Sequence, residues 1–176
     1  NSIGDYAFYY MTKMTTINLP ESLVYIGSKA FYSCKNLRSI KLSDKITVFK
    51  EYVFAKCYNL TELSIPKSLV TIEQYALSET GLYSLSISDN VVSLGQNALA
   101  NCLNISSITI GNGIKTIEYQ CLYKCQNLST LNIGENVEKI GVDALAYCKM
   151  LEVLVLPAKL TMVDEFSFWN CHSLRN

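Results

Sequence analysis

Cysteine is the residue type in this chain best equipped for covalent or metal chemistry, and it recurs at a regular spacing. The chain has seven cysteines in 176 residues. Six of them are 23 residues apart, or 45 apart where one member is missing: Cys34, Cys57, Cys102, Cys125, Cys148 and Cys171. Such a series can be a set of disulfides, a metal site, a nucleophile or a column of buried thiols.

A catalytic cysteine needs a general base, and the chain contains a single histidine. This residue, His172, directly follows Cys171, and adjacent residues on a turn usually point apart. No third residue is placed to orient the base, and the sequence offers no oxyanion site. We therefore expect His172 to be a surface or hydrogen-bonded histidine, and the chain to have no catalytic residues and no enzymatic activity.

The cysteines belong to a unit of about 23 residues that is repeated along the whole chain. Seven complete units and a truncated eighth begin at the apolar residues Ile3, Ile26, Phe49, Ile72, Leu94, Ile117, Ile140 and Val163. A second apolar column follows five residues later: Phe8, Phe31, Phe54, Leu77, Leu99, Leu122, Leu145 and Phe168. A period of this size is typical of a solenoid, in which each unit buries its apolar face against its neighbours.

The second half of each unit has the pattern of a short strand. Leu128-x-x-Leu131-x-Ile133 is one example, and its last apolar residues alternate with polar ones. Proline or glycine then ends the strand, as at Pro66 and Gly111. We expect a β-dominated α/β solenoid of about seven coils and a partial eighth, with one parallel concave sheet and short turns or second strands opposite it.

Neither a metal site nor disulfides fit the thiol column. Zinc requires two close pairs of ligands, and only Cys121 and Cys125 are close in sequence. Cys121 falls in the column that elsewhere holds alanine, so both are better explained by inward packing. Stacked coils would keep cysteine β-carbons about 4.8 Å apart, beyond the roughly 3.8 Å of a relaxed bridge. Met11 occupies the same column in the first unit, so we expect a structural column of free, buried thiols and no bound cofactor or metal.

The full pattern I-G-x-x-A-F-x-x-C-x-x-L-x-x-I-x-L-P-x-x-L-x-x-I resembles the BspA-type leucine-rich repeat family, and the resemblance covers the entire chain. It implies a leucine-rich-repeat solenoid of the kind found on surface-exposed bacterial and protozoan proteins and associated with adhesion. No enzymatic activity comes with the family. Lys50, Glu73 and Glu118 replace its usual glycine, and the fourth unit lacks one residue and its cysteine near Thr80, so we expect local changes of coil geometry there.

The polar residues that flank the inward strand residues define the candidate binding surface, which we expect to be concave. Most are small and uncharged, and they suit a protein or glycan partner. Serine and threonine also simply favour exposed sheets, so a role without any ligand stays open. The two columns comprise Thr16, Ser39, Glu62, Ser84, Ser107, Thr130 and Val153, and Asn18, Lys41, Ser64, Ser86, Thr109, Asn132 and Val155.

The charge and aromatic content narrow the choice of partner. Fifteen basic and fifteen acidic residues give no net charge, which argues against nucleic acid. No apolar run is long enough to insert into a membrane, and the first residues do not resemble a signal peptide. Tyrosines align in two columns, which pack together or form a second contact patch: Tyr6, Tyr52 and Tyr75, and Tyr9, Tyr32 and Tyr123.

Two classes of function remain. The first is a recognition or adhesion module located at a cell surface or outside the cell, and the second is an intracellular scaffold in a cytoplasmic or cytoskeletal assembly. Three glycosylation sequons begin at Asn59, Asn104 and Asn127, but the repeat itself generates them, so they favour secretion only weakly. We expect residues 1–176 to form one solenoid domain within a longer chain, whose ends contact further repeats or other chains.

Overall fold

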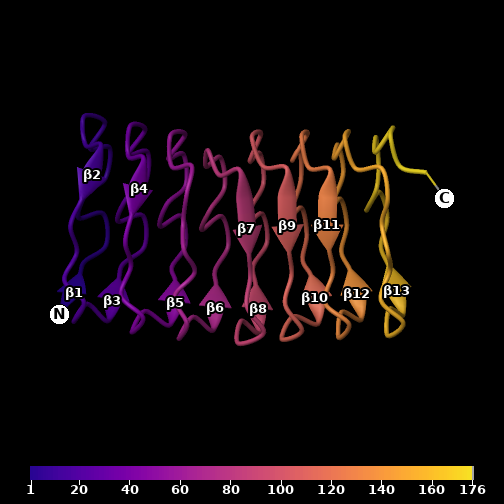
Figure 1. Ribbon diagram of the computed structural model, residues 1–176, viewed down its shortest axis with the longest axis horizontal. Helices are drawn as coiled ribbons and strands as arrows, with labels where there is room; N and C mark the ends of the chain where they lie inside the picture. Colours follow the sequence, from indigo (N-terminus) through magenta and orange to yellow (C-terminus); the bar gives the residue numbers. More distant parts are fainter. Residues whose placement is uncertain (176) are drawn as a thin grey trace.

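The chain winds into a stack of coils that succeed one another from the N-terminal to the C-terminal end (Figure 1). This computed structural model describes residues 1–175, so Asn176, the last residue of the predicted solenoid, lies outside the described residues. Thirteen short strands and no helix occur within that range. The expected solenoid of about seven coils with strands on two sides is confirmed.

The strands form two series on opposite sides of the coils. The strand predicted in the L-x-x-I-x-L half of the unit is present in five coils, as β2 (Thr16–Ile17), β4 (Ser39–Ile40), β7 (Ser84–Ser86), β9 (Ser107–Thr109) and β11 (Thr130–Asn132). The second series comprises β1 (Ser2–Ile3), β3 (Tyr25–Ile26), β5 (Val48–Phe49), β6 (Thr71–Ile72), β8 (Ser93–Leu94), β10 (Thr116–Ile117), β12 (Lys139–Ile140) and β13 (Met162–Val163).

All strand pairs are parallel, and their register places equal repeat positions side by side. Ile108 of β9 is paired with Leu85 of β7 on one side and with Leu131 of β11 on the other. The same register stacks the phenyl rings of Phe8, Phe31 and Phe54, whose neighbouring centroids lie 5.1 and 5.5 Å apart. The inward residues of successive coils therefore form one continuous apolar core along the stack.

The turn around the phenylalanine or leucine column has an unusual backbone. In each coil the residues two before and two after that column have a positive φ, and among the described residues none of them is glycine. Backbone N–H groups in the turn alternate in direction. The amide of Phe31 donates to the carbonyl of Val53 in the next coil at 2.9 Å, whereas that of Ala30 donates to Gly27 in its own coil at 3.3 Å. The turn is thus tied both to itself and to its neighbour.

The first series of strands does not form one unbroken sheet. It consists of a two-stranded sheet, β2 and β4, and a three-stranded sheet, β7, β9 and β11. The equivalent segment of the third coil is joined to β4 only by a single bridge between Ser39 and Glu62. In the seventh coil, residues 152–156 form no strand. The parallel pairing predicted from the sequence is therefore present, but it is interrupted at two places.

Candidate functional site

The polar columns predicted from the sequence lie on the outward side of the first series of strands, and we call this surface the first-strand face. Along β7, Ser84 and Ser86 are exposed, while Leu85 between them is only 4% exposed. The same alternation holds along β11. Twelve of the fourteen predicted residues are exposed, and Ser107 and Thr109 are half-buried.

Few interactions cross the first-strand face, so its side chains are largely free to meet a ligand. The amide of Asn132 donates to the hydroxyl of Thr109 at 3.4 Å. Lys41 and Glu21 form an ion pair at 3.2 Å, but both side chains are more than four-fifths exposed. Solvent screens such a pair strongly, so it contributes little to stability.

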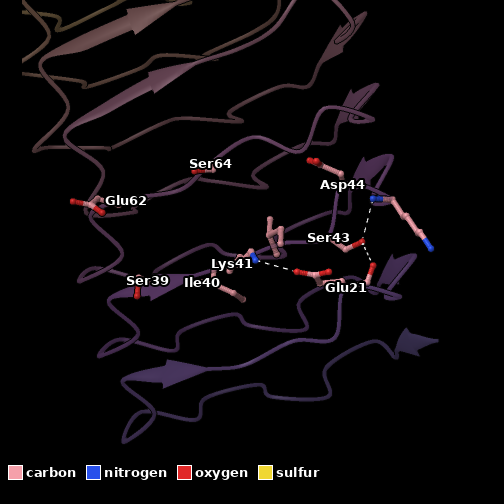
Figure 2. Close-up of a pocket in the computed structure, with 10 residues that line it drawn as sticks. Glu21, Ser39, Ile40, Lys41, Ser43, Asp44, Glu62 and Ser64 are labelled. Carbon is pink, nitrogen blue, oxygen red and sulfur yellow. Dashed lines mark hydrogen bonds and ion pairs between the residues drawn. The ribbon is translucent and has the colours of Figure 1, made fainter.

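A hollow of about 610 Å³ lies where the sheet is interrupted between the second and third coils (Figure 2). Its lining includes Ser39, Glu62 and the ion pair described above. Ser43 fixes one wall, because its hydroxyl donates to the carbonyl of Glu21 at 2.8 Å and accepts from the amide of Lys45 at 3.1 Å. The hollow offers charged groups of both signs and hydroxyl groups beside the apolar side chains of Ile40 and Leu42.

A second hollow of about 760 Å³ lies between β11 and residues 153–159, and we call it the β11 groove. Thr130 and Asn132 lie on one side of it, and Val153, Val155 and Leu156 on the other. The sequence placed four of these residues on the predicted face but did not reveal a groove. The sequence did contain one indication of the groove, because only the seventh coil carries apolar residues in both outward columns.

The one-residue deletion in the fourth coil produces a third hollow of about 440 Å³, beside Tyr58, Glu79 and Asn104. The tyrosine hydroxyl donates to the carboxylate of Glu79 at 3.2 Å. Gly81 passes so close to the third coil that a β-carbon would lie 2.1 Å from the carbonyl oxygen of Tyr58. The expected local change of coil geometry is therefore real, and glycine is required to accommodate it.

The thiol column lies inside the stack. Five of its six cysteines are fully buried and Cys171 is half-buried, and each thiol donates to the carbonyl oxygen of the phenylalanine or leucine column residue of the preceding coil at 3.1–3.4 Å. Burial raises the pKa of Cys34 and of Cys102 to about 11 and that of Cys125 well above its usual value. Neutral, buried thiols are poor nucleophiles and poor metal ligands.

In the fourth coil Thr80 occupies the position of the column cysteine, but its hydroxyl donates within its own coil and not to the preceding one. Thr80 donates to the carbonyl of Leu77 at 2.9 Å and lies 3.3 Å from the sulfur of Cys102. Cys121 is buried in the alanine column, as the sequence indicated. His172 is exposed beside Cys171. Within residues 1–175, no three histidine, cysteine or acidic side chains are grouped in a way that could hold a metal ion.

A tyrosine and lysine ladder runs over the turns of the first four coils. The rings of Tyr52 and Tyr75 stack with centroids 4.6 Å apart, and the ammonium of Lys29 lies 5.5 Å from the ring of Tyr6 and 5.1 Å from that of Tyr52. Tyr9 and Tyr32 stack in the same way at 5.2 Å. Tyr123 shares their column but packs against Tyr147 further along the stack.

The comparisons with known proteins identify the family. The model of the BspA type leucine rich repeat region matches with six copies over residues 1–102 and 49–175. The chain therefore belongs to the BspA-type leucine-rich repeat family, as the repeat pattern indicated. Families with this solenoid are typically non-catalytic, and leucine-rich repeats generally mediate protein interactions. A search of curated proteins found no match.

Solved structures agree with this assignment. The Treponema pallidum leucine-rich repeat protein is 28% identical, with a TM-score of 0.80 over 85% of this chain and 71% of its own. A leucine-rich repeat protein of Bacteroides ovatus is 22% identical, with a TM-score of 0.71 over 99% of this chain and 57% of its own. A leucine rich cell surface protein of Faecalibacterium prausnitzii is 21% identical, with a TM-score of 0.62 over 98% of this chain and 62% of its own. The similarity to the Bacteroides ovatus and Faecalibacterium prausnitzii proteins shows a shared fold only.

The described residues include no helix that could cross a membrane.

Proposed function

We propose that this chain is a non-catalytic recognition module, displayed at a cell surface, that binds a protein or glycan partner through the first-strand face. The observation that carries the proposal is the regular array of exposed side chains on that face, which along β7 and β11 flank a buried residue of the same strand. Such an array loses little conformational entropy when a partner binds, because the backbone beneath it is already ordered.

The surface location rests on similarity alone. A structurally similar protein of Faecalibacterium prausnitzii is described as a cell surface protein. Family membership supports the coarser function of a protein-interaction repeat module.

The tyrosine and lysine ladder is the competing surface for the same function. Its aromatic rings are large and partly exposed, which suits a protein contact or a sugar ring. Its lysines are largely engaged within the chain, however, since Lys29 lies against the rings of Tyr6 and Tyr52, and Lys56 lies 5.7 Å from the ring of Tyr32 and 3.9 Å from Glu79. We therefore assign the partner to the first-strand face, whose side chains have fewer internal partners.

The test begins with arrays of glycans and of extracellular proteins, probed with the wild-type chain to identify a binder. Ser86→Arg then places a bulky charge at the centre of the first-strand face, and we expect the affinity for that binder to fall at least tenfold without loss of folding. Val92→Arg is the matched control, because Val92 is 58% exposed and lies beside β8 on the opposite side.

Tyr52→Ala and Tyr75→Ala probe the ladder in the same assay. Unchanged affinity in these variants supports the proposal. Normal binding by Ser86→Arg together with loss of binding in the tyrosine variants would overturn it and transfer the site to the ladder.

A further inference from the structure

Among residues 1–175, no strand lies beside the outer edge of β11. In the two preceding coils the strand is followed by an amide that donates to the next coil, from Ile87 to Thr109 at 2.9 Å and from Ile110 to Asn132 at 2.8 Å. Ile133 holds the equivalent position one coil later. No backbone hydrogen bond joins Leu131 or Ile133 to residues 152–156 in the part of the chain that the structure describes.

These free groups face the β11 groove. In a parallel ladder the backbone groups of successive residues point alternately to the two neighbouring strands. The carbonyl of Asn132 accepts from the amide of Ile110, directly after β9, so the N–H and C=O groups of Leu131 and the N–H of Ile133 point the opposite way, toward the seventh coil. The groove's volume of about 760 Å³ is within the usual range for a binding cleft.

The far wall of the groove favours apolar side chains. Val153 and Val155 are 66% and 77% exposed, and they occupy columns that are polar in every other coil. They are β-branched residues at alternate positions, which pack well against the side chains of a neighbouring strand. Glu135 and Lys159 contribute opposite charges to the lining, so the groove does not select a strongly charged ligand.

We propose that an extended peptide segment of a protein partner binds along the free edge of β11 as an added strand. Its backbone would bond to Leu131 and Ile133, and its alternate apolar side chains would pack on Val153 and Val155. A peptide matches these features together because its donors and acceptors repeat with the spacing of a strand, as in other cases of β-strand addition. A glycan offers hydroxyl groups but no alternating apolar side chains. The inference rests on the proposed function and specifies the class of partner and its place on the face.

The probe is a phage-displayed library of random peptides of about twelve residues, long enough to span a strand of ordinary length. The selected peptide is then synthesised in two forms, methylated on alternate backbone nitrogens. We expect the form methylated on the edge facing β11 to bind at least tenfold more weakly than the other, because it lacks the donors of the ladder. Val155→Lys should weaken the unmodified peptide, whereas Val92→Lys, on the opposite side, should not.

Amide hydrogen exchange supplies an internal control. In the free protein the Ile133 amide should exchange much faster than the amides of Ile87 and Ile110, and the peptide should slow Ile133 at least tenfold while Ile110 stays unchanged. Three results would overturn the inference. In the first, the Ile133 amide of the free protein exchanges as slowly as that of Ile110. In the second, the library yields no binding peptide. In the third, a selected peptide binds but does not slow exchange of the Ile133 amide.

The two proposals fail separately. If Ser86→Arg abolishes binding of the partner found on the arrays but selected peptides leave Ile133 unprotected, the first-strand face stands and the β11 groove is wrong. If peptides protect Ile133 while Ser86→Arg and Val155→Lys both bind the array partner normally, the groove accepts peptides but the face is not where that partner binds.

Discussion

The thiol of Cys57 donates a hydrogen bond to the carbonyl oxygen of Phe31, with 3.1 Å between sulfur and oxygen. The carbonyl belongs to the preceding coil, and the same link recurs from Cys34 to Phe8 and from Cys125 to Leu99. Cysteine is small and apolar enough for the core and still carries a weak donor. The column therefore ties successive coils together without disulfides.

Removing one of these links should destabilise the stack. Cys125→Ala deletes the donor and leaves a small void, so we expect the free energy of unfolding in urea to fall by about 1–3 kcal/mol. Cys125→Thr is the control, because Thr80 shows that a hydroxyl is accommodated in this column. A Cys125→Ala protein as stable as wild type would show that neither the hydrogen bond nor the volume of the thiol contributes to stability.

Thiol reactivity should follow burial. In the native protein near neutral pH, we expect a disulfide reagent to modify the half-buried Cys171 first and the fully buried cysteines only very slowly. All seven should react at once in denaturant. Intramolecular bridges, detected as a lower mass under non-reducing conditions, would refute the assignment of free thiols.

The protein should lose stability at alkaline pH. The pKa of Cys34 is 9.0 in the unfolded chain and about 11 in the folded one, because burial disfavours the thiolate. The folded state thus holds its proton more tightly, and this contribution to stability is complete below about pH 9 and is lost as the pH rises toward 11. Urea unfolding across this interval should show the decline.

Cys34→Met is the control for the alkaline transition, since Met11 occupies the same column and has no proton to lose. Its stability should decline less steeply over the same interval. An identical decline in both proteins would assign the effect to other groups.

A charge in the core should damage more than one coil. Ile110 is 2% exposed in the middle of the stack. We expect Ile110→Asp to lower the free energy of unfolding by at least about 4 kcal/mol, because an unpaired carboxylate would be buried. Hydrogen exchange should rise in β7 and β11 as well as in the fifth coil. Ser86→Asp, on the exposed face, should change stability by less than about 0.5 kcal/mol. Exchange confined to the mutated coil would contradict a continuous core.

The positive φ positions give a test of the turn. Gln120 has φ of 50° in the turn of the sixth coil. Gln120→Gly relieves the steric cost of the left-handed backbone, but it also raises the conformational entropy of the unfolded chain, which lowers stability. Because the two effects oppose each other, the free energy of unfolding should change by less than about 1 kcal/mol. Gln120→Val should lower it by more than about 1 kcal/mol, because a β-branched residue tolerates this conformation poorly. Equal stability of the two variants would mean that this backbone strain is absent.

Repetition explains which features could be predicted. A buried column such as Leu85, Ile108 and Leu131 recurs at a fixed period, so coil number, strand positions and inward residues follow from sequence alone. The left-handed turn positions gave no signal, because residues such as Tyr52 and Lys56 occupy them in place of glycine. The hydrogen bonds of the thiol column could not be predicted from the sequence, because each acceptor belongs to the preceding coil. The breaks in the sheet depend on backbone pairing, which side-chain pattern does not encode.

The central claim is that a macromolecular partner binds to the first-strand face, and hydrogen exchange of the complex tests it most directly. With the array-identified partner bound, we predict slower exchange in β7, β9 and β11 and unchanged exchange in β8, β10 and β12 on the opposite side. Protection confined to the opposite strands, or to the turns that carry Tyr52 and Tyr75, would contradict it.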